Sequence, residues 1–301
     1  MRVIFGLGRS GRYRNPVVIL GVFDGVHIAH KRILTEAVKQ ARAIKGTSVV
    51  MTFWPHPQRE ESLYSLEHRL KLIADLGIDV CIVIKFNRKF YRIPARGFIR
   101  NVLIKRIGAK YIYVGKNFRF GKGARGDYRL LERLSHIHNF KLKVFDVIKI
   151  NHQPVSSTFI RSLIKKGEIK KAKKLLGRPV SILGTVTKGA SLARRLGFPT
   201  ANIDPHHEVL APSGVYAVEA IFNKRKFPGV CSIGSKPTFS VKGIQHIEVH
   251  IFNFKRNIYG RHLEIQFMRK IRNQKKFSSH LALAKQIKKD IILAKAIFSH
   301  H

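Results

Sequence analysis

Apolar and polar positions follow two different patterns along the chain, and the pattern changes once. Between Val17 and about Ile148, short apolar runs that read as buried strands alternate with segments whose apolar residues recur at helical spacing. The strand-like runs are VVILGVF, SVVMTF, DVCIVIKF, YIYVG and KVFDVI, and HRLKLIADLG is one of the helix-like segments. This alternation predicts an α/β domain with a parallel sheet and helices on both of its faces.

From about residue 180 the chain consists of short strand-like runs separated by turn signals. The runs are SILGTVT, GVYAVEAIF, PGVCSIG, HIEVHIFNF and HLEIQFM. They predict a small β-barrel or sandwich. A final amphipathic helix is expected, with Leu281, Ala284, Ile287, Ile291 and Ala294 on one stripe. We place the boundary near Arg178-Pro179, which gives an α/β domain of residues 1–178 and a barrel domain of residues 179–301.

The charge balance favours anionic partners. Of 301 residues, 58 are basic and 17 acidic, so the formal net charge is +41. Such a surface attracts nucleic acid, anionic membranes or phosphate-bearing substrates. The basic residues are dispersed, and the densest stretch, residues 165–174, is interrupted in the manner of a solvated helix face. Charge alone identifies neither the fold nor the reaction.

Cysteine content and apolar run length indicate the compartment. Cys81 and Cys231 are isolated in strand-like runs, with neither metal-ligand spacing nor a disulfide framework. No apolar run approaches the roughly 20 residues of a membrane span. The start, MRVIFGLGRSGR, has too short an apolar part for a secretory signal. We therefore expect a cytoplasmic protein with no membrane partner.

Two histidines follow the first of these strands, in the stretch GVFDGVHIAH. His27 and His30 lie where the apolar run of residues 17–20 gives way to a helical pattern. Backbone N–H groups at a helix start lack partners and favour anions, and imidazoles there can donate hydrogen bonds to phosphate. Alternatively, the two side chains merely cap and pack the turn. The residues alone leave both interpretations open.

A second stretch, TKGASLARRLGFPTAN, combines glycines, cations and neutral oxygens. Gly189 and Gly197 allow close backbone approach, while Arg194 and Arg195 supply positive charge for phosphate. Thr200 and Asn202 are two apart, so an extended segment would place both on one face. Mg²⁺ prefers such oxygen ligands and completes its shell with water and phosphate. The alternative is a Gly-Pro turn with a capping threonine.

Short motifs follow one another in a fixed order over roughly residues 15 to 297. In the first half they are G-x-F-D-G-x-H-x-x-H (21–30), T-F-x-P-H-P (52–57), V-G-x-x-F-R-F-G (114–121), R-G-D (125–127) and S-S-T-x-x-R (156–161). In the second half they are L-G-F-P-T-A-N (196–202), G-V-Y-A-V (214–218), I-G-x-x-P-T-F (233–239), I-E-V-H (247–250) and Y-G (259–260). Together they resemble the family of bifunctional bacterial riboflavin kinases/FMN adenylyltransferases, the prokaryotic FAD synthetases.

For the first domain, the resemblance implies a Rossmann-like nucleotidyltransferase. FMN phosphate would attack the α-phosphorus of ATP, giving FAD and pyrophosphate without a covalent enzyme intermediate. His27, His30 and Arg161 match the family's catalytic phosphate ligands. The implied nucleotide-binding residues are Gly21, Phe23, Asp24, Gly25, Ser156, Ser157 and Thr158, with Gly189, Arg194 and Arg195 in the second domain. The implied flavin-binding residues are Pro55, His56, Pro57, Asn117, Phe118, Arg125 and Asp127.

For the second domain, the resemblance implies a β-barrel riboflavin kinase followed by a C-terminal helix. It would move the γ-phosphoryl group of ATP to the ribityl 5′-hydroxyl of riboflavin. Thr200 and Asn202 match the family's Mg²⁺–nucleotide ligands, and Glu248 matches its general base. If Ile247 and Val249 face the core, Glu248 projects from the other face of its strand. The expected small-molecule partners are riboflavin, FMN and ATP, with FAD as product and Mg²⁺ as cofactor.

Four positions depart from the family pattern. Ala29 stands where the H-x-G-H motif has glycine, and Phe159 where a basic residue is common. Asn253 and Gln274 stand where aspartate and glutamate are frequent. A methyl group at Ala29 could crowd a closely approaching nucleotide. We therefore expect the departures to bear more on adenylyl transfer than on the kinase step.

Three alternatives remain beside the bifunctional enzyme. The +41 charge would suit a nucleic-acid-binding protein on a decayed synthetase scaffold, with salt-dependent, non-specific binding of polyanions. No recognition motif is present, so we expect no sequence-specific nucleic-acid binding. A riboflavin kinase with an impaired adenylyltransferase domain is the second alternative. The third is another H-x-G-H enzyme such as a cytidylyltransferase, against which the kinase-like second half argues.

Overall fold

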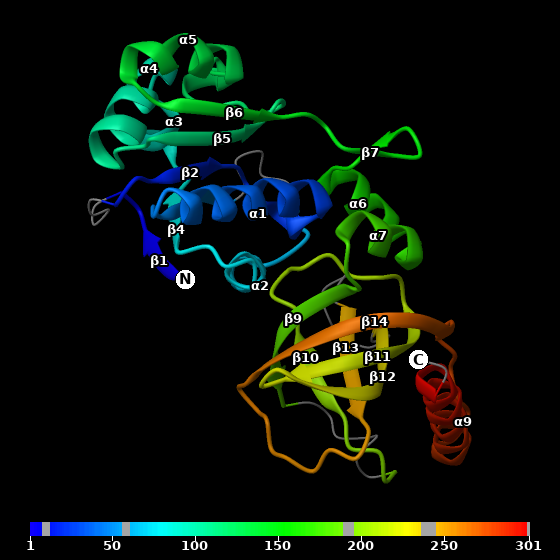
Figure 1. Ribbon diagram of the computed structural model, residues 1–301. Helices are drawn as coiled ribbons and strands as arrows, with labels where there is room; N and C mark the ends of the chain where they lie inside the picture. The colour runs from blue at the N-terminus through cyan, green and yellow to red at the C-terminus, as the bar shows by residue number, and fades with distance from the viewer. Residues whose placement is uncertain (8–12, 56–60, 189–195, 236–244, 300–301) are drawn as a thin grey trace. The chain divides into compact units, whose positions relative to one another are not determined.

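The computed structural model describes residues 1–7, 13–55, 61–188, 196–235 and 245–299 (Figure 1). The chain forms two compact units. One contains residues 1–62 and 66–159, and the other residues 63–65 and 160–301. This division concerns packing and not activity, so the functional boundary at residues 178–179 stays a prediction.

The first unit is built on a parallel sheet of six strands in the order β1-β4-β3-β2-β5-β6. The strands are β1 (Arg2–Phe5), β2 (Val17–Leu20), β3 (Ser48–Trp54), β4 (Val80–Lys85), β5 (Tyr111–Gly115) and β6 (Lys141–Phe145). Every residue of β2 is buried, because the strand lies between two others and under helices on both sides. The predicted parallel α/β sheet is confirmed.

Helices cover both faces of this sheet, and each face has its own apolar core. Helices α1 (Ile28–Ala43) and α2 (Leu66–Ala74) pack on one face. The π-helical segment η2 (Phe98–Arg106) and helix α5 (Tyr128–His138) pack on the other. The remaining short elements are η1 (Asp24–Val26), α3 (Arg88–Tyr91), α4 (Ala95–Gly97), η3 (Lys122–Ala124) and the hairpin of β7 (Lys149–Ile150) with β8 (Gln153–Pro154).

The second unit is a closed antiparallel barrel in the order β10-β13-β12-β11-β14-β9. Its strands are β9 (Val180–Thr187), β10 (Ala201–Asp204), β11 (Gly214–Phe222), β12 (Arg225–Ser235), β13 (Gln245–Ile251) and β14 (His262–Arg272). Helices α6 (Ser157–Lys165) and α7 (Ile169–Leu176) precede the barrel along the chain, and α9 (His280–Ser299) follows it. The predicted barrel with a C-terminal helix is confirmed.

Helix α9 packs beside β11, β12 and β14 of the barrel (Figure 1). Ala294 is fully buried, and Asp290 forms a buried ion pair with Arg272 at 2.7 Å. The predicted apolar stripe is wrong at Leu281, which is 66% exposed. Leu281 lies in the first turn of the helix, where single apolar side chains are often left in water.

Strand β1 was missed by the sequence analysis, which began the sheet at Val17. It pairs in parallel with β4 at the edge of the sheet. None of its four residues is buried, so the stretch lacks the continuous apolar pattern of the central strands.

Candidate active sites

The turn between β2 and α1 forms the first candidate site. Three of its residues have left-handed backbone conformations: Phe23 (φ 55), Gly25 (φ 78) and Val26 (φ 38). A Cβ atom on Gly21 would lie 2.7 Å from the ring of Phe23, so glycine is needed there for the aromatic side chain to fold back. The turn is thus compact and conformationally strained.

The two histidines lie directly after this turn, in contact with one another. Their rings stack with centroids 3.6 Å apart, and the ring of Phe23 meets His30 edge-on at 5.2 Å. His27 is the N-cap of α1: its Nδ1 accepts a hydrogen bond from the backbone N–H of His30 at 3.4 Å. Because Nδ1 is an acceptor, neutral His27 has its proton on Nε2, which can donate to an anion. The capping and phosphate interpretations are therefore compatible.

Side chains from three other elements hold this turn. The carbonyl of Val22 accepts hydrogen bonds from Thr52 Oγ1 at 2.7 Å and from Arg69 Nη1 at 2.6 Å. Ser157 Oγ donates to the carbonyl of Asp24 at 2.8 Å. The strained segment is thus fixed by β3, by α2 and by the first residue of α6, which lie far apart in the sequence.

The S-S-T-x-x-R motif forms the start of α6. Ser156 Oγ accepts a hydrogen bond from the N–H of Phe159 at 3.2 Å, and Thr158 is exposed. Arg161 is a nearly buried cation, 8% exposed. Of the predicted residues in this motif, Ser157 contacts the histidine turn, because its hydroxyl donates a hydrogen bond to the carbonyl of Asp24.

Several of the predicted flavin-binding residues lie on one loop of the first unit. Phe120 and Gly126 exchange two backbone hydrogen bonds, 3.0 and 2.8 Å, which close the loop. Phe118 stacks on Phe120 at 5.8 Å. Arg125 and Asp127 border a surface hollow of about 950 Å³. Asp127 also has a structural task, because its carboxylate accepts a hydrogen bond from Leu130 N–H and caps α5.

The other predicted residues of this group are exposed or lie elsewhere. Asn117 is exposed beside Phe118, and Pro55 is exposed directly after β3. His56, Pro57, Gly189, Arg194 and Arg195 lie outside the residues that the structure describes.

The second candidate site is a row of polar residues across three barrel strands. Strand β13 lies between β10 and β12, and Glu248 is directly opposite Asn202 on one side and Ser232 on the other. Directly opposed residues of antiparallel strands project from the same face, with Cβ atoms about 4.5–5.5 Å apart. Their neighbours Ile247 and Val249 are 1% and 0% exposed. The prediction that Glu248 projects away from the core is confirmed.

Gln274 extends this row at its far end. Its Nε2 donates to Ser232 Oγ at 2.8 Å and to the carbonyl of Ile233 at 3.0 Å. A glutamate could not donate to that carbonyl, so the amide has a hydrogen-bonding task of its own. Asn253, the other departure, has φ 55, which asparagine and aspartate tolerate better than most residues. Neither departure disrupts the local structure.

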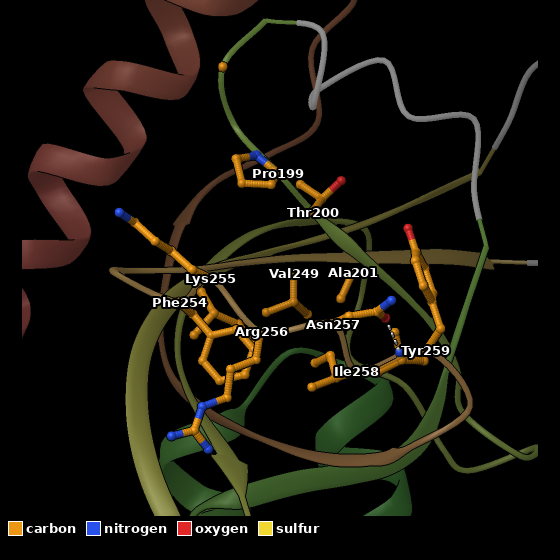
Figure 2. A pocket seen from close by; sticks show the side chains of 13 residues that line it. Pro199, Thr200, Ala201, Val249, Phe254, Lys255, Arg256, Asn257, Ile258 and Tyr259 are labelled. Carbon is orange, nitrogen blue, oxygen red and sulfur yellow. Dashed lines mark hydrogen bonds between the residues drawn. The ribbon is translucent and has the colours of Figure 1, made fainter.

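A pocket of about 430 Å³ lies at the end of the barrel, beside the loop that precedes β10 (Figure 2). Thr200 borders it together with Pro199, and the segment of residues 254–259 brings Lys255 and Arg256 to it. His250 Nδ1 lies 2.8 Å from the carbonyl of Pro199, which ties the loop of Thr200 to β13. The pocket therefore combines apolar walls with two cations and a threonine.

The residues present fit a magnesium ion shared with phosphates. Thr200 and Asn202 offer neutral oxygens, and Glu248 offers a carboxylate opposite Asn202. Oxygen donors suit Mg²⁺, which commonly keeps waters and substrate phosphates in its shell. Among the described residues no group of three His, Cys, Asp or Glu side chains could form an all-protein cage.

Sequence reasoning missed three residues of these sites. Arg69 lies in a helix-like run, where a basic residue reads as solvated, yet it is 1% exposed. Ser232 shows its relation to Glu248 only through strand register. His250 stands inside the quoted I-E-V-H motif, which was a usable signal for its contact with Pro199.

Comparison with known proteins assigns the family. A model described as FAD synthetase matches residues 10–159, and one described as riboflavin kinase matches residues 176–298. A bifunctional riboflavin kinase/FMN adenylyltransferase of Buchnera aphidicola subsp. Schizaphis graminum is 38% identical over 99% of both chains. The chain belongs to this family. The predicted resemblance is confirmed.

Other relatives of this bifunctional family are similar over nearly the same length. The Escherichia coli K12 protein is 34% identical over 94% of this chain and 92% of its own, and that of Haemophilus influenzae 34% over 99% and 100%. A solved structure described as a macrolide-efflux protein from Streptococcus pneumoniae superposes with a TM-score of 0.84 at 28% identity, covering 98% of this chain and 99% of that one. In the described part of this chain, no helix has the length and apolar character of a membrane span.

Proposed function

We propose that the barrel domain, residues 179–301, phosphorylates riboflavin to FMN and that the α/β domain, residues 1–178, adenylylates FMN to FAD. Family membership supports both steps. The observation that supports them most strongly is that the matched residues meet in space although they are far apart in sequence. Asn202 lies opposite Glu248 in one unit, and Ser157 bonds to Asp24 in the other.

In the kinase step, Glu248 would act as the general base. Its carboxylate would take the proton of the ribityl 5′-hydroxyl as that oxygen bonds to the γ-phosphorus of ATP, and ADP would leave. Lys255 and Arg256 border the pocket beside Thr200 and would supply positive charge for phosphates bound there. Asn202 and Glu248 are not among the residues that line this pocket. Thr200 and Asn202 would hold Mg²⁺, which when bound neutralises phosphate charge.

In the adenylyl step, the protein supplies position and charge rather than a nucleophile. An FMN phosphate oxygen would bond to the α-phosphorus of ATP, and the bond to the β-phosphate would break to release pyrophosphate. Nε2–H of His27, the ring of His30 and backbone N–H groups at the start of α1 would donate to the phosphate oxygens that gain charge. Arg161 is assigned a phosphate-binding role by its motif.

The remaining binding assignments follow from the motif matches. Gly21, Phe23 and Gly25 would shape the nucleotide turn, while the loop of Asn117, Phe118 and Arg125 would contact the flavin. A cytoplasmic location with ATP as co-substrate fits both steps. Non-specific attraction of polyanions stays a second prediction, supported by the net charge of +41.

The test supplies each step with its own substrates. Purified protein is incubated with riboflavin and Mg-ATP to measure ADP release, and separately with FMN and Mg-ATP to measure pyrophosphate release. Glu248→Gln should abolish most of the ADP release and leave pyrophosphate release unchanged. His30→Ala should abolish most of the pyrophosphate release and leave ADP release unchanged. ADP release without pyrophosphate release would favour the kinase with an impaired first domain, and absence of both would refute the enzyme.

A further inference from the structure

Among the described residues, Arg69 is one of the largest fully buried side chains, and the mechanism above does not explain it. It lies in α2 and is 1% exposed. Its Nη1 donates to the carbonyl of Val22 at 2.6 Å and, more weakly, to that of Phe53 at 3.5 Å. Among the described residues, Nε and Nη2 have no hydrogen-bond partner. Burial of a cation is costly unless it is fully paired, so a position that only needs filling would favour a neutral side chain.

The surroundings of Arg69 keep it charged. Its guanidinium lies 5.2 Å from the centre of the Trp54 ring, within the range of cation–π attraction. Burial lowers the pKa of Arg69, while the negative charge of Asp24 opposes that shift. Arginine stays protonated in proteins because its intrinsic pKa is very high. The fold therefore places a permanent positive charge close to the turn that contains Asp24.

The turn itself needs support from outside. Phe23 and Val26 adopt left-handed backbone conformations at φ 55 and φ 38, which a β-branched valine rarely does. Strained segments of this kind persist only where the surrounding structure holds them. Arg69 and Thr52 both bond to the carbonyl of Val22, immediately before the strained residues. Helix α2, which contains Arg69, also packs against η1.

We infer that Arg69 is a positioning residue for adenylyl transfer. Through the Val22 carbonyl it holds the turn that presents His27 and His30, and its buried charge raises the positive potential where the ATP phosphates bind. It acts through the backbone and does not touch substrate. The inference rests on the proposed adenylyltransferase activity of this unit.

Four single variants of the full chain separate the effect of the Arg69 charge from that of its hydrogen bond to the Val22 carbonyl. Arg69→Met removes the charge at similar length, Arg69→Lys keeps it, and Arg69→Gln retains a donor without charge. Lys71→Met is the matched control, because it removes an exposed cation from the same helix. For each variant, kcat and the KM values for ATP and FMN are measured in FAD formation, together with the unfolding temperature.

We expect Arg69→Met to raise the KM for ATP at least about ten-fold, with kcat/KM for ATP falling about 100-fold and the KM for FMN unchanged. Arg69→Lys and Lys71→Met should each change the KM for ATP less than about three-fold. A merely structural role would lower the unfolding temperature without this selectivity for ATP. A rise of less than ten-fold in a folded Arg69→Met protein, or an equal rise in Arg69→Lys, overturns the inference. If Arg69→Met does not fold, Arg69→Gln is judged by the same ten-fold limit.

Binding of inorganic pyrophosphate distinguishes this inference from the proposed function. If the unaltered protein forms no FAD, the proposed activity fails, but calorimetry with pyrophosphate still decides the role of Arg69. At least about ten-fold weaker binding in Arg69→Met, with Arg69→Lys unchanged, supports the inference. Equal binding by all variants overturns it.

Discussion

Glu248 lies directly opposite Asn202 in the paired strands β13 and β10. The register therefore holds the proposed base and a proposed magnesium ligand side by side on one barrel face. A slip of one residue would turn one of them toward the core, where Ile247 and Val249 are buried. The barrel thus fixes the spacing of the two groups without a direct bond between them.

Glu248→Gln is expected to lower kcat for FMN formation by about 100-fold or more, the usual scale of general-base catalysis. The amide keeps the shape of the carboxylate but cannot accept the hydroxyl proton. Initial rates of FMN formation and direct measurement of ATP binding check this, and ATP binding should change little. Glu219→Gln is the control, because Glu219 is a strand carboxylate of the same barrel that pairs with Lys226 at 2.9 Å. Unchanged kcat in Glu248→Gln would exclude it as the base.

Asn202→Ala is expected to raise the Mg²⁺ concentration that gives half-maximal kinase activity by at least about ten-fold. Loss of even an outer-shell partner of a metal commonly costs that much in affinity. Thr187→Val is the matched control, since Thr187 lies opposite Asn202 on its other side, in β9. Titration of Mg²⁺ at fixed ATP gives the result. Identical titration curves for Asn202→Ala and the unaltered protein would remove Asn202 from the metal site.

His30→Ala is expected to lower kcat for FAD formation by about 10²–10³, the usual cost of losing one donor to a developing negative charge. FMN formation should stay nearly normal, because the kinase residues are on a separate unit. Chromatographic rates of FMN and FAD formation measure both. Equal loss of the two activities would indicate damage to folding rather than to the phosphate site.

Ala29→Gly tests in the same assay whether the methyl group crowds the nucleotide. Ala29 lies in the first turn of α1, next to His30. If the methyl hinders ATP, glycine should raise FAD formation, although it costs the helix up to about 1 kcal/mol of stability. Unchanged FAD formation would show that the turn has adjusted to alanine.

Both cysteines are expected to resist thiol reagents in the folded protein at pH 8. Burial raises the pKa of Cys81 to about 12 and also raises that of Cys231. The thiolate is the reactive form, so at pH 8 only about one Cys81 side chain in ten thousand is reactive. Labelling rates with and without urea provide the measurement, and rapid labelling of either cysteine in the folded state would contradict the burial.

The same shift predicts how stability depends on alkaline pH. In the unfolded chain the Cys81 thiol ionises near 9.0, whereas in the folded state it keeps its proton until about 12. Between these values the unfolded state holds fewer protons, so stability falls as the pH rises. Cys81→Ala should therefore show a smaller decrease in the free energy of unfolding over this pH range, as measured by urea unfolding at several pH values.

The sequence predicted those features that depend on local pattern. Alternating runs gave the parallel sheet and the barrel, and the strand period placed Glu248 on the face away from Ile247. Features that depend on long-range contact could not be predicted. Arg69 reads as a solvated helix residue, and only the tertiary fold buries it against Val22. The pairing of Ser232 with Glu248 likewise follows from register between strands that a single sequence does not specify.

The most direct test of the account is one incubation of the purified protein with riboflavin, ATP and Mg²⁺, sampled over time and resolved by chromatography. The account predicts that FMN appears first and is then converted to FAD, with FAD as the final flavin product. Accumulation of FMN with no FAD, unrelieved by Ala29→Gly, would contradict the bifunctional account and show that the α/β domain has lost its chemistry.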